Sequence, residues 1–359
     1  MTAQPAIAAN EGDIVIAREG SAGVLRLNRP KALNALTFDM VLLIARALDD
    51  FESDPAIATI LLEGAGERGL CAGGDIRSLY DDAKAGGDLG RIFWAEEYRL
   101  NARIASFSKP FVSYMDGLVM GGGIGLAGHS SHRITTERSK VAMPEAGLGF
   151  FPDVGGTWLL SHAPGEIGTY FGLTGNIMNG AEAVYIGLSD VCIAAKDWPA
   201  LRGAIIKLSG GSSAADVTAL LRSFSASGGD VPIASHRAMI DRIFAQDSVE
   251  QIVSALERDG SDFADKARAA ILGKSPRGLK LTLKMLRLGR HSSSLKECLV
   301  REYRAVMEAH KTHDFIEGVR AAIVDKDRNP KWSPPRLEEV TPQMIEKYLA
   351  PGGTADLAF

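Results

Sequence analysis

Two carboxylates stand out in an apolar segment of the chain, residues 143–156 (MPEAGLGFFPDVGG). Glu145 and Asp153 each follow a proline, whose ring fixes φ and stiffens the backbone. A carboxylate in apolar, rigid surroundings loses hydration, which raises its pKa and suits it to proton transfer near neutral pH. The segment therefore predicts acid–base or nucleophilic chemistry. The alternative is a surface loop that carries two solvated acids.

Two glycine turns could supply the hydrogen-bond donors for such chemistry. Residues 72–75 (AGGD) and 121–123 (GGG) each follow an apolar stretch and precede a predicted helix. Turns of this kind leave backbone N–H groups without partners at a helix N-terminus. Two such donors that face one point form an oxyanion hole, worth about 3–4 kcal/mol per donor in comparable enzymes. The alternative is that these glycines only permit tight turns and close helix packing.

Residues 123–128 (GIGLAG) also fit the dinucleotide-binding pattern G-x-G-x-x-G. A single match is a weak signal. It lies deep inside the predicted domain, and a mostly helical half of the chain follows it instead of a continued strand–helix alternation. The sequence therefore disfavours dinucleotide binding.

The bulk composition is that of an ordinary globular protein. The chain has 359 residues, of which 46% are hydrophobic and 23% charged, with a formal net charge of −4. This balance predicts no general attraction to nucleic acid or to an anionic membrane surface. No run of about 18 uncharged apolar residues occurs, so no membrane-spanning helix is predicted.

The cysteines and histidines suggest neither a disulfide framework nor a metal site. The 3 cysteines, Cys71, Cys192 and Cys298, are odd in number and form no C-x-x-C pair. His129 and His132 lie close together, but no third ligand is indicated. Few cysteines, together with an N-terminus that lacks a basic start and an apolar run, predict a cytoplasmic location.

Hydrophobic periodicity predicts an α/β domain followed by helices. Short apolar, β-branched stretches predict strands, the first two forming a hairpin, at residues 14–17, 24–27, 58–62, 111–115, 133–136 and 191–194. After residue 196 the pattern becomes that of amphipathic helices. We therefore expect a disordered tail (1–13), an α/β catalytic domain (14–195) and a helical C-terminal region (196–359).

These motifs occur in the order typical of the crotonase (enoyl-CoA hydratase/isomerase) superfamily, which the chain resembles over roughly residues 14–195. The matching segments are residues 28–36 (NRPKALNAL), 71–76 (CAGGDI), 120–123 (MGGG) and 144–156 (PEAGLGFFPDVGG). Within the superfamily the chain is most similar to a branch of thioester hydrolases. That similarity rests on residues 71–77, 96–101 and 143–156 and on the long helical C-terminal half.

The resemblance implies a fold and a ligand. The fold is an α/β, crotonase-type spiral of ββα units followed by a helical C-terminal region. The substrate is an acyl-CoA, so CoA is part of the substrate and no separate cofactor or metal is expected. Lys31 and Leu33 would lie along the CoA moiety, and Ala72 and Ile76 would contact the substrate. Many members form trimers, so a homo-oligomer is a further expectation.

The resemblance also implies roles for the acids and glycines. The thioester oxygen would accept hydrogen bonds from the N–H groups of Gly74 and Gly122. Glu145 matches the catalytic glutamate, acting either as a nucleophile that forms an acyl-anhydride or as a general base for water. Asp153 matches an aspartate of the hydrolase branch, and Glu97 a substrate-contacting glutamate. On structural grounds alone, Asp153 could instead cap a helix over residues 154–160, and Glu97 could lie on a solvated helix face.

One departure from the hydratase pattern decides the expected reaction. Gly125 stands where hydratases carry a second glutamate. We therefore expect an acyl-CoA thioester hydrolase for a short branched 3-hydroxyacyl-CoA, in valine breakdown. The alternatives are an enoyl-CoA hydratase or isomerase that uses one glutamate, and a non-catalytic acyl-CoA-binding protein.

Overall fold

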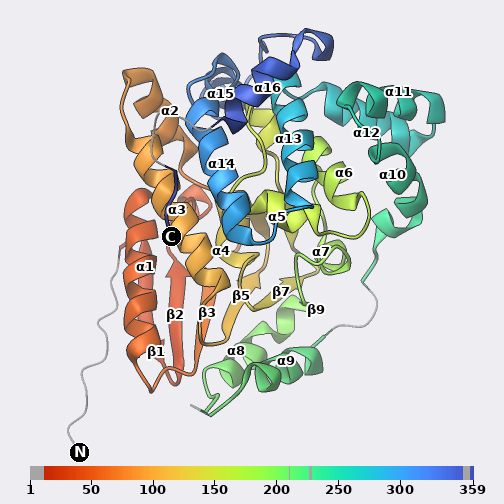
Figure 1. Ribbon diagram of the computed structural model, residues 1–359. Coiled ribbons are helices and arrows are strands. Elements are labelled where there is room, and N and C mark those ends of the chain that lie inside the picture. Colours follow the sequence, from red (N-terminus) through yellow and green to blue (C-terminus); the bar gives the residue numbers. More distant parts are fainter. Residues whose placement is uncertain (1–11, 210, 226–228, 351–355) are drawn as a thin grey trace, which may run out of the picture. The chain divides into compact units, whose positions relative to one another are not determined.

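The computed structural model describes residues 12–209, 211–225, 229–350 and 356–359, and the chain forms two compact units (Figure 1). Unit 1 comprises Met1–Gly74, Leu100–Val141 and Met178–Val231. Unit 2 comprises Asp75–Arg99, Ala142–Ile177 and Pro232–Phe359. Each unit therefore combines segments that are distant in the sequence. Residues 1–11 of the expected tail lie outside the described residues, and the expected domain boundary at residue 195 stays a prediction.

The strands all begin in the first 191 residues. They are β1 (Ile14–Glu19), β2 (Ala22–Leu27), β3 (Thr59–Gly64), β4 (Gly69–Cys71), β5 (Phe111–Met115), β6 (Leu118–Met120), β7 (His132–Thr136), β8 (Lys140–Ala142) and β9 (Val191–Ile193).

The helices dominate the second half of the chain. Those before residue 190 are α1 (Phe38–Ser53), α2 (Ile76–Ala85), α3 (Leu89–Ala105), α4 (Gly122–Ala127), α5 (Gly156–Ser161), α6 (Ile167–Thr174) and α7 (Gly180–Tyr185). Those after it are α8 (Trp198–Ile205), α9 (Ala214–Ser223), α10 (Arg237–Phe244), α11 (Val249–Asp259), α12 (Asp262–Leu272), α13 (Pro276–Gly289), α14 (Leu295–Ala309), α15 (His313–Val319) and α16 (Pro342–Leu349).

The main sheet of unit 1 has the strand order β1-β2-β3-β5-β7-β9 (Figure 1). Only the first pair is antiparallel, the predicted hairpin in which Ile14 lies opposite Leu27. The remaining pairs are parallel. Parallel strands inside a sheet are covered on both faces, and accordingly every residue of β5 and every residue of β3 except Gly64 is buried. Helices α8 and α9 cover one face of this sheet with Leu201, Ile205, Val217 and Leu221.

A second sheet of three short strands has the order β4-β6-β8, and it was not predicted. Each strand has only three residues, too few for a visible period, and β4 begins at Gly69. Strands β4 and β6 are parallel, with Cys71 opposite Val119. The helix predicted after the second glycine turn is α4, which follows β6 and begins at Gly122. The two short strands thus bring the two glycine turns side by side.

Unit 2 is helical, and α14 contributes a buried face to it. The helix begins after Ser294, whose side chain accepts a hydrogen bond from the Glu297 amide, the usual role of a serine N-cap. It packs against α5 and α16. Its buried residues recur at helical spacing and include one acid among the apolar side chains: Cys298, Leu299, Glu302, Tyr303, Ala305, Val306, Met307 and Ala309.

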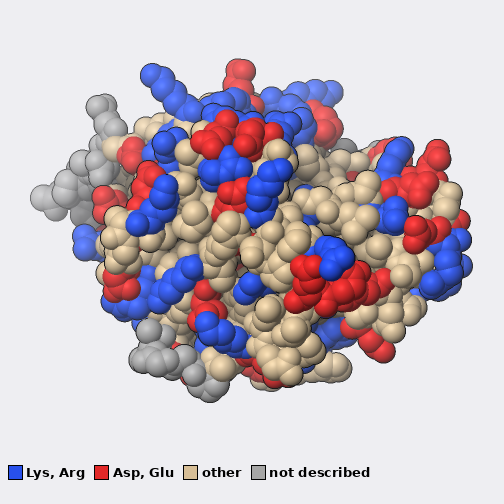
Figure 2. Space-filling view, turned by 90° about the horizontal axis from the view of Figure 1, so that it is seen from above, with Lys and Arg blue, Asp and Glu red and all other residues tan. Residues whose placement is uncertain are grey.

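The surface agrees with the balanced composition. Figure 2 shows basic and acidic side chains intermixed on the face that it draws. This is the pattern expected from 40 Lys+Arg and 44 Asp+Glu. Among the described helices, none has the length and the hydrophobicity that crossing a membrane requires.

Candidate active site

Unit 2 buries several carboxyl groups, and four of them are linked by electrostatic interactions: Glu97, Glu145, Asp153 and Glu302. The relative exposure is 2% for Glu97, 7% for Glu145, 6% for Asp153 and 0% for Glu302. In the described part of the chain, none of the four forms an ion pair with a lysine or arginine. Buried acids without counter-charges are costly and cluster at functional sites. This cluster, the four-acid cluster below, is therefore the candidate active site.

Glu145 is held by a rigid turn. It begins the 3-10 helix Glu145–Leu148, directly after Pro144, and Gly149 ends this helix with φ of 70°. A Cβ at Gly149 would lie 2.1 Å from the carbonyl oxygen of Asp314, so only glycine fits between this turn and α15. Oε2 of Glu145 is buried and has no hydrogen-bond partner among the described residues. The carboxyl group is thus positioned by the backbone and free to act on a substrate.

Asp153 receives a hydrogen bond from a buried tyrosine. The hydroxyl of Tyr98 donates to Oδ2 of Asp153 at 2.7 Å, and Tyr98 itself is 0% exposed. The alternative that Asp153 caps the next helix is wrong, because α5 begins at Gly156 and its N-cap is Gly155. Asp153 therefore has no capping role to explain its burial.

Glu97 precedes Tyr98 on α3, and its surroundings differ from those of the preceding residue, Glu96. Glu96 forms an ion pair with Arg99 at 2.6 Å on the surface. Glu97 is buried, and its Oε1 has no hydrogen-bond partner within the described residues. The alternative of a solvated helix face is therefore correct for Glu96 and wrong for Glu97.

Burial raises the pKa of every acid in the four-acid cluster. For Glu97 and Glu145, burial and then the charge of Asp153 raise the pKa well above its usual range. Burial raises the pKa of Asp153 to about 7, although the hydrogen bond from Tyr98 lowers it. Burial also raises the pKa of Glu302 to about 8, against hydrogen bonds that favour its ionised form. The pKa values of Asp153 and Glu302 therefore lie near neutral pH, where a carboxyl group can exchange protons.

In unit 1 the two glycine turns lie next to each other. A Cβ at Gly73, whose φ is 115°, would lie 3.8 Å from the amide nitrogen of Gly122. The N–H of Leu36 donates to the carbonyl of Gly73 at 2.9 Å, which fixes the first turn. Gly122 is the first residue of α4, so its N–H has no acceptor within that helix. The N–H of Gly74 has no acceptor among the described residues. Both turns thus keep free donors.

The predicted CoA-binding loop joins the first of these turns. The N–H of Ala72 donates to the carbonyl of Leu33 at 3.0 Å. Asn34 fixes the loop from inside: its side chain accepts from the Arg29 amide at 2.9 Å and donates to two loop carbonyls. Lys31 is exposed, as a phosphate-binding cation must be. Ile76, the first residue of α2, belongs to unit 2.

Two residues that contact the segment around Asp153 were not predicted from the sequence as site residues. The first is Tyr98, because a tyrosine hydroxyl gives no sequence signal for its partner. The second is Glu302, which lies on α14 about 150 residues after Asp153 and outside the motifs that carry the resemblance. A signal existed, because Glu302 occupies a core position in the apolar stripe that contains Cys298, Leu299 and Ala305.

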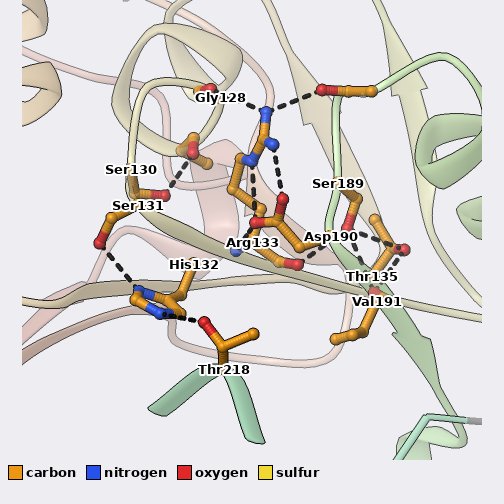
Figure 3. A network of polar contacts seen from close by, with 12 residues as sticks. Gly128, Ser130, Ser131, His132, Arg133, Thr135, Ser189, Asp190, Val191 and Thr218 are labelled. Carbon is orange, nitrogen blue, oxygen red and sulfur yellow. Dashed lines mark hydrogen bonds and ion pairs between the residues drawn. The ribbon is translucent and has the colours of Figure 1, made fainter. Parts of the chain in front are cut away.

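His132 has structural partners within unit 1 (Figure 3). Its Nδ1 lies 2.9 Å from the Ser131 hydroxyl. Its Nε2 lies 3.0 Å from the carbonyl of Ala214 and 3.1 Å from the Thr218 hydroxyl, both on α9. His132 therefore ties β7 to α9. The described residues contain no group of three or more His, Cys, Asp or Glu side chains arranged to hold a metal ion.

Curated relatives match almost the whole chain. The proteins of Xenopus tropicalis and Rattus norvegicus, both named 3-hydroxyisobutyryl-CoA hydrolase, mitochondrial, are 40% and 41% identical to it. Each match covers 97% of this chain and 91% of the relative. The predicted resemblance to the thioester-hydrolase branch is therefore confirmed.

The predicted cytoplasmic location is wrong. The names of these relatives place them in mitochondria. The physical reason lies in the cysteine argument, which separates oxidising from reducing compartments and does not distinguish one reducing compartment from another.

Solved structures share the fold. A carnitinyl-CoA dehydratase from Mycobacterium thermoresistibile is 42% identical, with a TM-score of 0.91, over 97% of this chain and 99% of that chain. An enoyl-CoA hydratase from Rhodobacter sphaeroides is 40% identical, with a TM-score of 0.89, over 97% and 100% of the two chains. The predicted crotonase fold is thus confirmed. The family model for enoyl-CoA hydratase/isomerase matches residues 22–349. The chain belongs to the enoyl-CoA hydratase/isomerase family.

Proposed function

We propose that the chain is an acyl-CoA thioester hydrolase that acts on 3-hydroxyisobutyryl-CoA in valine degradation. One observation carries the proposal: Glu97, Glu145 and Asp153 are buried in unit 2 without a cationic partner among the described residues. The names of the curated relatives support the same substrate. The proposal needs no separate cofactor, because CoA is part of the substrate, and a homo-oligomer stays a prediction.

The reaction adds water to the thioester, breaks the C–S bond, and gives the free acid and the thiol of CoA. We assign oxyanion binding to the N–H groups of Gly74 and Gly122, since donors aimed at a developing negative charge supply the largest catalytic effect. Glu145 attacks the carbonyl carbon or takes a proton from the attacking water, and both routes stay open.

The other two acids suit a substrate that carries a 3-hydroxyl group. Burial raises the pKa of Glu97, which favours its protonated form, and in that form the carboxyl group can donate a hydrogen bond to that hydroxyl. With a pKa of about 7, Asp153 is present in both protonation states and can accept a hydrogen bond or orient water. A site that is built to bond a hydroxyl rejects analogues that lack it.

An enoyl-CoA hydratase or isomerase is the second candidate, because the titles of the two solved structures name a dehydratase and a hydratase. Gly125 argues against the two-glutamate form of this reaction. It is buried in α4, where its N–H donates to the carbonyl of Gly121 at 3.1 Å, and it offers no acid. A non-catalytic acyl-CoA-binding protein is the third candidate.

Released thiol tests the proposal directly. Supplied with 3-hydroxyisobutyryl-CoA, the purified chain is expected to release free CoA, measured with a thiol reagent, faster than with isobutyryl-CoA, which lacks the hydroxyl. Crotonyl-CoA, followed by the loss of enoyl absorbance, is the control for the second candidate. Rapid hydration of crotonyl-CoA without thiol release would refute the proposal. Binding measured by calorimetry, with no product from either thioester, would favour the third candidate.

Tyr98→Phe is expected to shift the pH–rate profile. The tyrosine hydrogen bond lowers the pKa of Asp153, so its loss raises that pKa and moves the acid limb of kcat/KM to higher pH. Tyr303→Phe is a matched control, since the ring of Tyr303 packs on Tyr98 at 6.4 Å but its hydroxyl donates to the carbonyl of Arg91. If Tyr98→Phe and the wild type have the same pH–rate profile, the ionisation of Asp153 does not determine the acid limb of kcat/KM.

A further inference from the structure

The backbone directly after Asp153 has an unfavourable conformation. Val154 has φ of 52° and Gly155 has φ of 77°, so two consecutive residues are left-handed. Glycine adopts this region freely, but a β-branched residue does so rarely, at a cost of about 1–3 kcal/mol. Such a conformation persists only where the surroundings hold it, and it is common at functional sites.

Glu302 makes the contacts that hold this turn. Its Oε2 accepts a hydrogen bond from the N–H of Gly155 at 2.7 Å. Its Oε1 accepts from the N–H of Thr157 at 3.1 Å and from the Thr157 hydroxyl. Both oxygens are thus directed at the first turn of α5, where backbone N–H groups lack partners. Glu302 is 0% exposed, so solvent does not weaken these bonds.

The two ends of the Asp153 segment are therefore fixed by different helices of unit 2. Tyr98 on α3 bonds the Asp153 side chain, and Glu302 on α14 bonds the backbone two and four residues later. A purely structural role for Glu302 would not require an acidic side chain at this position of α14. Burial raises the pKa of Glu302, and the charge of Asp153 raises it further, so burying a second acid nearby is costly for stability.

We propose that Glu302 is a positioning residue for Asp153: through the amides of Gly155 and Thr157 it fixes the left-handed turn that orients the Asp153 carboxyl group. The inference rests on the proposed function. It assigns a role in the reaction to the C-terminal helical region, which lies outside the motifs that carry the family resemblance.

Glu302→Ala is expected to lower kcat for 3-hydroxyisobutyryl-CoA by about 10- to 100-fold with KM changed by less than about threefold, since a small misplacement of a reacting group has effects of this size. The acid limb of the pH–rate profile is expected to shift with it. In the Asp153→Asn variant, adding Glu302→Ala is expected to lower kcat further by less than about threefold. The reason is that Glu302 acts through Asp153, which this variant has already lost.

Glu166→Gln is the matched control. Glu166 is also a buried acid of unit 2, accepts from the Thr169 hydroxyl and pairs with Arg287 and Arg290 at 2.7 Å. Its replacement is expected to lower the melting temperature but to leave kcat within about twofold of the wild type.

Thr157→Val keeps the side-chain volume and removes one of the bonds, so it serves if Glu302→Ala does not fold. It is expected to lower kcat by about three- to tenfold, again without further effect on Asp153→Asn. An unchanged kcat in Glu302→Ala and Thr157→Val would overturn the inference. So would a loss of kcat in the Asp153→Asn background as large as the loss in the wild-type background. In both cases a wild-type chain that hydrolyses the thioester leaves the proposed function standing. A wild-type chain that hydrolyses no thioester would overturn both.

Discussion

Glu145→Gln is expected to lower kcat for thioester hydrolysis by about a thousandfold or more while acyl-CoA still binds. A neutral amide can neither attack the carbonyl carbon nor take a proton from water, and losses of this size follow removal of a nucleophile or base. Steady-state thiol release gives kcat, and calorimetry with a non-hydrolysable acyl-CoA analogue gives the dissociation constant.

The fold should tolerate this change, which makes the result easy to interpret. Glutamine has the same shape, and Oε2 of Glu145 has no partner among the described residues that an amide would disturb. The unfolding temperature of Glu145→Gln at pH 8 is therefore expected to equal or exceed that of the wild type. Turnover within tenfold of the wild type would exclude Glu145 as nucleophile and as base.

Asp153→Asn is expected to lower kcat by about a hundredfold and to stabilise the fold above pH 7. The ordinary pKa of an aspartate is 3.8, and burial raises that of Asp153 to about 7. Between these values the folded chain binds a proton that the unfolded chain does not, so stability falls as the pH rises through this window. At about 1.36 kcal/mol per pKa unit, the loss from Asp153 is on the order of 4 kcal/mol.

Urea denaturation at pH 5 and pH 8 measures this effect. The free energy of unfolding of the wild type is expected to fall between the two, and that of Asp153→Asn to fall less. Asp314→Asn is a matched control in unit 2. Asp314 is 1% exposed and accepts from the Ser275 hydroxyl and the Ser333 amide, so its replacement should destabilise the fold at both pH values. Equal pH dependence in all three proteins would contradict the burial of an ionisable Asp153.

The main sheet was predictable because its strands are buried on both faces. The stretch that forms β5 (FVSYM) is short and is bounded by Pro110 and Gly117, which distinguishes it from a longer amphipathic helix. The short strands β4, β6 and β8 were not predictable, since three residues show no period and their pairing depends on distant partners. Helix α7 was missed for a similar reason, because six residues give too little periodicity.

The candidate site was predictable where local sequence constrains it. Prolines and glycines around Glu145 and Asp153 determine the backbone there, and these types are visible in the sequence. The burial of Glu97 could not be predicted from the sequence. Its neighbour Glu96 is also a glutamate, and that side chain instead pairs with Arg99. The contact between Glu302 and the segment after Asp153 joins positions about 150 residues apart, which only the tertiary structure reveals.

Unit 2 combines three stretches of the chain, the last of which ends at Phe359. During synthesis on the ribosome, Glu97, Glu145 and Asp153 therefore emerge long before α14 supplies Glu302. A nascent chain that has reached residue 231 contains all three stretches of unit 1, whereas unit 2 still lacks the stretch that begins at Pro232 and carries α14. The burial that raises the pKa of these acids can therefore be completed only after that stretch has been synthesised.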